Sequence, residues 1–272
     1  MPRSDEGAGP VLGAAVRAYE DALGERLVAA YALGSLAHGG FSPAVSDVDL
    51  GLVLADPLLP ADGDAIGQVA TGLAAADPGR YGRLSVFWGS RATLAGTEGG
   101  GRFPALDRLD LLHHGLLLSG SEARAGLPEP SRAELLVTGA EFALDGLGGD
   151  DVLALLLRPE ALLAEGIRRV TKLVLFPPRF LYTAETGLVG ANDAAARRYA
   201  DAARPGARLV AAARDWRTRA PAPGEALAPL EQELLPLYRA FVGDHRVRLL
   251  AVGRDDLAAR FDAWQSRLGA RP

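Results

Sequence analysis

The sequence contains no cysteine among its 272 residues. This absence excludes disulfides, thiolate-bound zinc, iron–sulfur clusters and catalytic thiols. Long apolar runs are also missing, since no uninterrupted stretch approaches the roughly 18 residues that a membrane-spanning helix needs. Lysine is nearly absent, because Lys172 is the single lysine among 29 basic residues. We attribute the excess of arginine, alanine and glycine to a GC-rich genome, so composition alone carries little functional weight.

The remaining composition is that of an ordinary globular protein. Charged residues make up 23% of the chain and hydrophobic residues 49%, which argues against disorder. A net charge of −5 does not favour a nucleic-acid partner. Residues 1–16 carry acids and glycines where a signal peptide would have its apolar core. We therefore expect a cytoplasmic protein with no membrane or nucleic-acid partner; its oligomeric state stays open.

Length and apolar periodicity predict two modules. The first, residues 1–104, is expected to be an α/β domain with a small mixed sheet. Its predicted elements are helices over 11–24 and 63–77 and strands over 26–33, 47–55 and 82–88. The second, residues 105–272, is expected to be an all-α helical bundle. Its helices are predicted over 105–118, 131–146, 151–157, 159–176, 192–203, 206–219, 225–243 and 255–268, with breaks such as Phe-Pro-Pro at 176–178.

The most informative stretch is residues 33–54, LGSLAHGGFSPAVSDVDLGLVL. Asp47 and Asp49 lie two residues apart on a predicted strand, so both carboxylates should share one face. Such a pair is repulsive without a cation, and oxygen ligands suit Mg²⁺, which usually also binds substrate phosphates. At Gly34 and Ser35, a turn lets backbone N–H groups approach phosphate and adds a hydroxyl. The Gly-Ser pair alone is explained by an ordinary turn, and the Asp-x-Asp pair alone by a solvated strand edge. Their combination favours a site for phosphate and a metal ion.

These residues resemble the signature of a known superfamily. Gly34-Ser35, the glycine-rich spacer and Ser46-Asp47-Val48-Asp49-Leu50 look like the polymerase-β-type nucleotidyltransferases. The form of the spacer is similar to that of the aminoglycoside adenylyltransferases that modify streptomycin and spectinomycin. Residues 179–187, RFLYTAETG, and 192–196, NDAAA, resemble the C-terminal helical domain of those enzymes. The likeness covers about residues 26–219, and the aspartate motif is its most specific part.

The resemblance implies a reaction and roles for individual residues. A nucleoside monophosphate, AMP from the substrate ATP, would pass to a hydroxyl of a small aminoglycoside-like acceptor as pyrophosphate leaves, which would make the protein an antibiotic-resistance enzyme. Asp47 and Asp49 would be the catalytic, Mg²⁺-binding residues. The nucleotide would be bound by Gly34, Ser35, Ser46 and, from the helical module, Arg179. A surface charge following two prolines is an equally good interpretation of Arg179.

Two positions depart from the family pattern. The family has a glutamate on the next strand that helps bind the metal and accepts the proton of the acceptor hydroxyl, and the matching residue here is Ser85. A serine hydroxyl is a poor base at pH 7 and a weaker Mg²⁺ ligand. A phosphate-contacting lysine of the family is replaced by Asn192, which we interpret as a helix N-cap. Two alternatives therefore remain: a catalytically impaired nucleotide-binding relative, and a transferase that acts on a protein. Asp107 or Asp110 could replace the missing base.

Charge in the helical module is uneven. Residues 129–165 hold eight acids and two arginines, whereas residues 166–219 hold eleven basic residues and four acids. This pattern suits an anionic nucleotide and a small cationic acceptor, although solvated helix faces would produce it too. The spacing of the four histidines matches no zinc motif. For His38, in the glycine-rich spacer, we favour a solvent-facing loop residue over a substrate contact.

Overall fold

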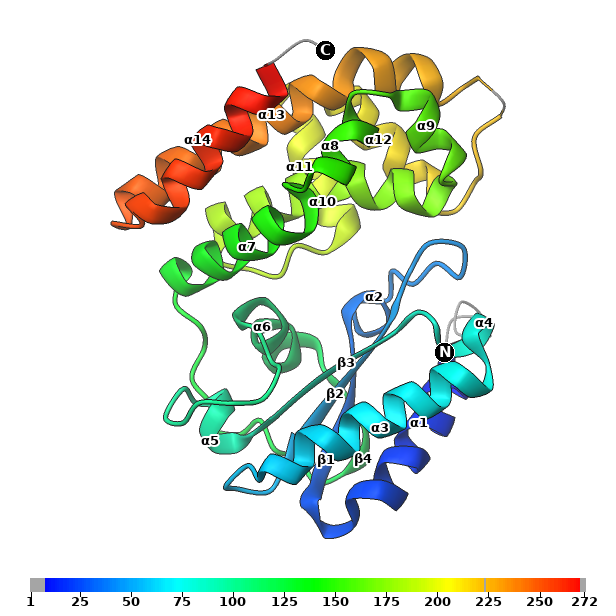
Figure 1. The fold of residues 1–272 in the computed structure, drawn as a ribbon, viewed down its shortest axis with the longest axis vertical. Helices are drawn as coiled ribbons and strands as arrows, with labels where there is room; N and C mark the ends of the chain where they lie inside the picture. Colours follow the sequence, from blue (N-terminus) through cyan, green and yellow to red (C-terminus); the bar gives the residue numbers. More distant parts are fainter. Residues whose placement is uncertain (1–7, 223, 270–272) are drawn as a thin grey trace. The chain divides into compact units, whose positions relative to one another are not determined.

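The computed structural model describes residues 8–222 and 224–269, and it divides into two compact units between Pro130 and Ser131. Figure 1 labels the elements of each unit. The boundary expected after residue 104 falls inside the first unit. The reason is that helix α6 (Ala105–His114) and strand β4 (Leu116–Gly120) both pack against strand β1 of that unit.

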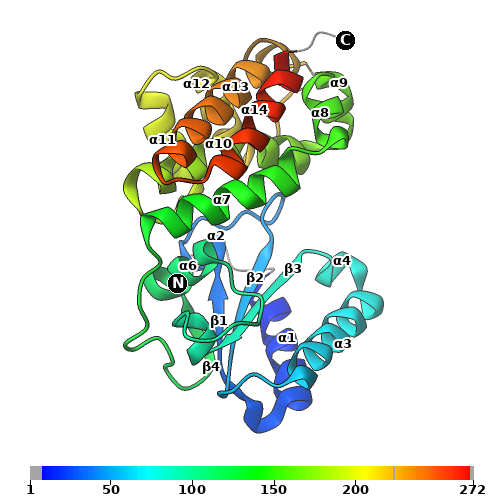
Figure 2. The ribbon, with the colours of Figure 1, turned by 60° about the vertical axis from the view of Figure 1, so that its left-hand side comes forward.

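The first unit is built on a four-stranded mixed sheet with strand order β3-β2-β1-β4. Strand β1 (Leu27–Leu33) pairs antiparallel with β2 (Val48–Leu54) and with β4, whereas β2 pairs parallel with β3 (Leu84–Ser90). Figure 2 shows the four strands in a second view. The small mixed sheet predicted from the sequence is confirmed, and three of its strands lie close to their predicted bounds.

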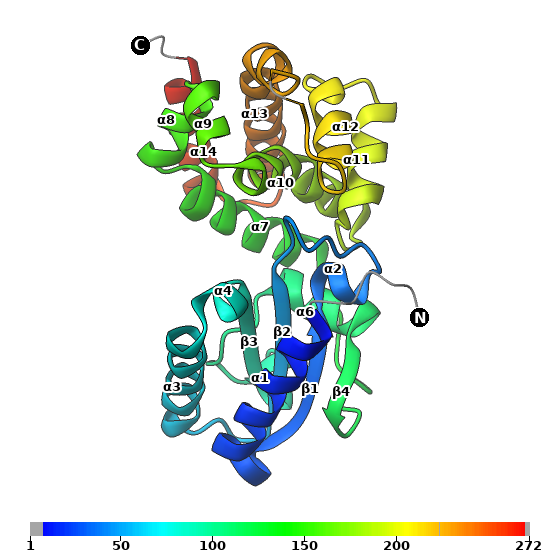
Figure 3. The same cartoon turned by 90° about the vertical axis from the view of Figure 1, so that its right-hand side faces the viewer.

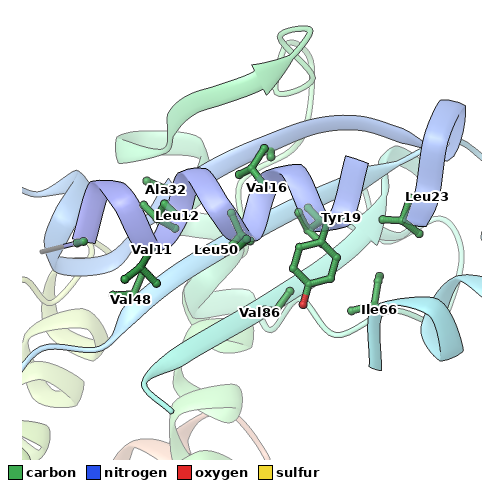
Figure 4. Packing of buried hydrophobic residues seen from close by; sticks show 14 of the residues in the cluster. Val11, Leu12, Val16, Tyr19, Leu23, Ala32, Val48, Leu50, Ile66 and Val86 are labelled. Carbon is green, nitrogen blue, oxygen red and sulfur yellow. The ribbon is translucent and has the colours of Figure 1, made fainter. Parts of the chain in front are cut away.

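Helices cover both faces of this sheet. Helices α1 (Ala8–Leu23) and α3 (Pro60–Ala76) contact one face, as Figure 3 shows, and the close view in Figure 4 shows apolar side chains of α1 beside Leu50 and Val86. On the other face, Tyr31 and Leu33 pack with Leu111 of α6 and with Leu94 of the short helix α5 (Arg91–Leu94). Because strand residues alternate between faces, Asp49 projects to the α6 side while its neighbours face α1.

Strand β4 was not predicted. The helix expected over 105–118 ends at His114, because Gly115 leaves the helical conformation with φ −46° and ψ 125°. The following leucines, at 116–118, are all exposed, so they carry no period-2 pattern of burial. Their strand is defined by pairing with β1, which is distant in the sequence and therefore invisible to local periodicity.

The second unit is helical, which confirms the predicted bundle. Its helices are α7 (Arg132–Leu147), α8 (Asp150–Leu156), α9 (Pro159–Ala164), α10 (Ile167–Thr186), α11 (Asn192–Asp201), α12 (Ala207–Trp216), α13 (Leu227–Ala251) and α14 (Asp255–Gly269). Shorter helical turns in the first unit are η2 (Gly24–Arg26), α2 (Gly34–Ala37) and α4 (Pro78–Tyr81). Within the described ranges, no helix is both long enough and apolar enough to span a bilayer.

The break expected at Phe-Pro-Pro is wrong, because α10 continues through Pro177 and Pro178. A proline has no N–H, so Pro177 cannot donate to the carbonyl of Leu173 four residues earlier. The hydroxyl of buried Tyr238, on α13, donates to that carbonyl at 2.9 Å. A contact from another helix thus compensates for the proline. The actual interruption lies at Gly166, which has φ 91° and separates α9 from α10.

Candidate functional site

The first strand ends in a turn that requires glycine. Gly34 has φ +63°, a conformation that L side chains rarely adopt. A Cβ atom there would lie 2.1 Å from Oδ2 of Asp49, far inside contact distance. Glycine is therefore needed both for the backbone conformation and for the close approach of the Asp49 carboxylate. The two halves of the sequence motif, separated by the spacer, meet at this point.

The burial of residues 47–50 alternates as the strand pattern predicts, although β2 begins only at Val48. Asp47 and Asp49 are half-buried, whereas Val48 and Leu50 are buried in the core beneath α1. Asp49 lies in register with Leu33 on β1 and with Ser85 on β3. Two carboxylates offer the oxygen donors that Mg²⁺ prefers. The residues present, two half-buried carboxylates beside a glycine turn, therefore fit the group that the sequence motif implies.

Ser85 is the immediate neighbour of Asp49 across the parallel pair of strands. Residues paired in a sheet share a face, so the Ser85 side chain lies on the Asp49 side. Its neighbours Leu84 and Val86 belong to the opposite core, beneath α1. Ser85 and its two neighbours therefore lie on opposite faces of the sheet. This face of β3 presents a hydroxyl at the position beside Asp49.

Helix α6 brings a third carboxylate to the Gly34 turn. Oδ2 of the buried Asp110 accepts a hydrogen bond from the Gly34 N–H at 2.6 Å, and its Oδ1 contacts Nε2 of His38. The Gly34 amide that we expected to bind phosphate therefore donates to Asp110 in this structure. Asp110, one of the two acids considered as a replacement base, therefore reaches the turn.

The expectation of a solvent-facing His38 is wrong. Its side chain is only 9% exposed, because the short helix α2 ends at Ala37 and His38 folds back against α6. Its ring meets that of His114 edge-on, with 4.6 Å between centroids. Burial lowers the pKa of His114, and the neighbouring His38 lowers it further. The prediction failed because His38 contacts α6, a helix more than seventy residues further along the sequence, and local spacing does not reveal such a contact.

Ser46 shapes the loop that leads into β2. Its Oγ accepts a hydrogen bond from the N–H of Ser42 at 3.0 Å, and its own N–H donates to the Ser42 carbonyl at 2.8 Å. Arg83 donates to the carbonyl of Pro43 at 2.9 Å and so ties the same loop to the start of β3. Ser35, half-buried, is the second residue of α2. In the sequence, Ser35 directly follows Gly34 and Ser46 directly precedes Asp47.

Arg179 lies in the second unit, on α10 directly after the two prolines. Its Nε donates to the carbonyl of Gly190 at 2.8 Å, and its guanidinium lies 5.8 Å from the ring centroid of Phe176. The segment held in this way leads into α11. Asn192 is the first residue of that helix and Ala191 is its N-cap, so the predicted capping role of Asn192 is wrong.

Much of the basic segment 166–219 is paired within the second unit. Glu185 has a side chain that is 12% exposed, and it forms ion pairs with Arg198, Arg204 and Arg248. The buried Arg217 lies 3.6 Å from Asp193, and its burial lowers its pKa. Part of the positive charge that suggested an anionic ligand therefore stabilises the helices themselves.

Comparison with known proteins identifies the fold. No protein family model and no curated protein sequence matches the chain. Among solved structures, the chain is similar to the spectinomycin adenyltransferase AAD(9) from Enterococcus faecialis, determined with ATP and spectinomycin. The TM-score is 0.55 at 12% identity, and the match covers 97% of this chain and 100% of that chain. At this identity the likeness concerns the fold, and the chain has an aminoglycoside adenylyltransferase-like fold.

Proposed function

We propose that the protein is a nucleotidyltransferase that transfers AMP from ATP to a hydroxyl of a small cationic acceptor such as an aminoglycoside. The observation that carries this proposal is the meeting of Gly34 and Asp49 on an adenylyltransferase-like fold. A glycine turn that approaches a carboxylate so closely brings the expected phosphate-binding and metal-binding halves of the motif together.

Each residue of the motif has a role in this proposal. Asp47 and Asp49 hold Mg²⁺, which when bound neutralises charge on the triphosphate. The Gly34-Ser35 turn and Ser46 orient the triphosphate, and Arg179 adds positive charge. The acceptor oxygen forms a bond to the α-phosphorus while the bond to pyrophosphate breaks, in line with it. Positioning and electrostatic stabilisation supply most of the rate.

In this proposal the chain differs from an efficient transferase in lacking a good base to accept the proton of the acceptor hydroxyl. Ser85, beside Asp49, is a poor base at pH 7. Both oxygens of Asp110 are engaged, one by Gly34 and one by His38, so Asp110 holds the turn in place. Transfer should therefore be slow. The same observation favours a second candidate function, that of a nucleotide-binding protein that has lost catalysis.

The test measures ATP–Mg²⁺ binding by calorimetry and pyrophosphate release with a panel of acceptors that includes streptomycin, spectinomycin and acceptor proteins. We expect Asp47→Asn and Asp49→Asn to abolish Mg²⁺-dependent ATP binding. The matched control is Asp64→Asn, an exposed acid on α3, which should behave as wild type. Binding without release for any acceptor would identify a binding protein. Unchanged affinity in both aspartate variants would overturn the metal assignment.

A further inference from the structure

Three side chains near the Gly34 turn gather donor atoms that the proposed reaction does not use. His38, Asp110 and His114 each offer one ligand atom, and these atoms all lie within 4.8 Å of one another. They come from two segments, with His38 directly after α2 and the other two residues on α6. The cluster unites residues more than seventy positions apart in the sequence.

Two of the three metal-donor residues, Asp110 and His114, are positioned by helix α6. Asp110 and His114 lie four residues apart on α6, a spacing that places both side chains on one face of a helix. The second oxygen of Asp110 accepts the Gly34 N–H at 2.6 Å. Metal-binding carboxylates and imidazoles characteristically have their other polar atom held by such an outer hydrogen bond, which fixes their orientation.

The chemistry of the donors selects a class of ion. Two imidazoles and one carboxylate suit Zn²⁺ and the neighbouring transition metals, whereas Mg²⁺ prefers oxygen donors alone. Three protein ligands leave a fourth position for water or another ligand. Asp110 and His38 are largely shielded from solvent, while His114 is exposed and gives an ion access to the cluster.

We propose that His38, Asp110 and His114 bind a transition-metal dication of the zinc class, at a site distinct from the Asp47–Asp49 pair. The bound ion would replace the direct hydrogen bond between His38 and Asp110. This inference does not depend on nucleotidyl transfer, because its evidence is the donor set alone.

The experiment titrates Co²⁺ into the full chain without a histidine tag. Visible absorption reports Co²⁺ bound to imidazole in a low-coordinate site, and Zn²⁺ is added to displace it. We expect one Co²⁺ per wild-type chain to produce this absorption, and Zn²⁺ to displace it. His114→Ala should weaken binding at least about tenfold, and His38→Gln should do the same.

Two controls make the result specific. His113→Ala removes the adjacent exposed histidine, which instead contacts Glu129 at 2.8 Å, and should bind Co²⁺ as wild type does. Asp49→Asn should also retain the absorption. The proposal is overturned if wild type binds no Co²⁺, if both His114→Ala and His38→Gln bind it normally, if His113→Ala weakens binding as much as His114→Ala, or if Asp49→Asn alone removes it. Circular dichroism of each variant establishes that the fold is intact.

Discussion

Buried polar groups serve different purposes in the two units of the molecule. In the first unit one set of them meets at a turn, where the Gly34 amide, Asp110 and His38 are connected beside Asp49, while buried Asp62 binds Arg26 elsewhere. In the second unit they are dispersed, and the hydroxyl of Tyr238 replaces a hydrogen bond lost at a proline. Polar burial thus holds the Gly34 turn against α6 in the first unit, and it supports the helices themselves in the second.

The start of α12 illustrates the structural use of polar groups in the second unit. Its N-cap is Gly206, which has no side chain to accept a hydrogen bond from the first turn. Glu233, a buried residue of α13, accepts the Leu209 N–H at 3.1 Å and also binds Arg208 at 2.6 Å. The Glu233 carboxylate thereby caps the start of α12, and Arg208 neutralises its charge.

The largest effect is expected at Ser85, in the first unit. A substitution there should change the rate of transfer without raising the stability of the fold. If the missing base limits the reaction, Ser85→Glu should raise acceptor-dependent pyrophosphate release by about 10²–10⁴-fold, the usual range for general-base catalysis. The uncharged Ser85→Gln is the matched control and should show no gain. Fast turnover by wild type with any acceptor would contradict this interpretation of Ser85.

Buried His245, in the second unit, should make the free energy of unfolding depend on pH. Burial against Phe241 and Phe261 lowers the pKa of His245 to about 4, from an ordinary value of 6.5. Above pH 6.5 the residue is neutral in both states. As pH falls from 6.5 towards 4, the unfolded chain takes up the proton first, and folding should lose up to about 3 kcal/mol.

Urea unfolding of wild type and His245→Leu at pH 7 and pH 4.5 measures this effect. The wild type should lose more stability than the variant on acidification, and the difference isolates His245 from other titrating groups. Parallel losses in both proteins would show that His245 is protonated without penalty in the folded state. ATP–Mg²⁺ affinity at pH 7 should be the same for both.

Arg179 tests whether the polar groups of the second unit serve only its own helices. Under the proposed function, Arg179→Ala should lower ATP–Mg²⁺ affinity by about tenfold, equivalent to about 1.4 kcal/mol. The control is Arg197→Ala, since Arg197 is 65% exposed on α11. Because Arg179 also holds the Gly190 carbonyl, Tm is measured in parallel. A lower Tm with unchanged ATP affinity would make Arg179 one more structural group of the second unit.

Tyr238→Phe should have the smallest effect. It removes the hydroxyl that serves the Leu173 carbonyl and should lower the free energy of unfolding by about 1 kcal/mol, with nucleotide binding unchanged. Tyr182→Phe, on α10 but half-buried, is the control and should cost less. Equal losses in the two variants would mean that the proline at 177 needs no compensation.

The sequence predicted those features that depend on neighbouring residues. Alternation of Val48, Asp49 and Leu50 was readable because each side chain's face follows from its place in the strand. The position of Ser85 beside Asp49 followed from the same rule together with the family pattern. Features made by distant contacts were not predictable. Strand β4 exists through pairing with β1, and α10 passes its prolines with the help of α13.

The histidine cluster shows the same limit. Asp110 and His114 have a helical spacing that sequence analysis can recognise, but the third donor arrives from a glycine-rich loop. No local pattern indicates that His38 turns towards α6. A search for paired histidine and acid residues on predicted helices, without requiring the third ligand, would have marked α6 for attention.

The hydrogen bond between Gly34 and Asp110 joins a turn and a helix through a single donor and a single acceptor. A ligand that draws this carboxylate away leaves the amide free for another acceptor, and an anion that takes the amide leaves the carboxylate oxygen free for another donor or an ion. Equilibria that share a bond in this way obey reciprocity, so each ligand changes the affinity of the other by the same factor. Occupancy at α6 and occupancy at the turn are therefore thermodynamically linked, and measuring either one with the other saturated gives the strength of that linkage.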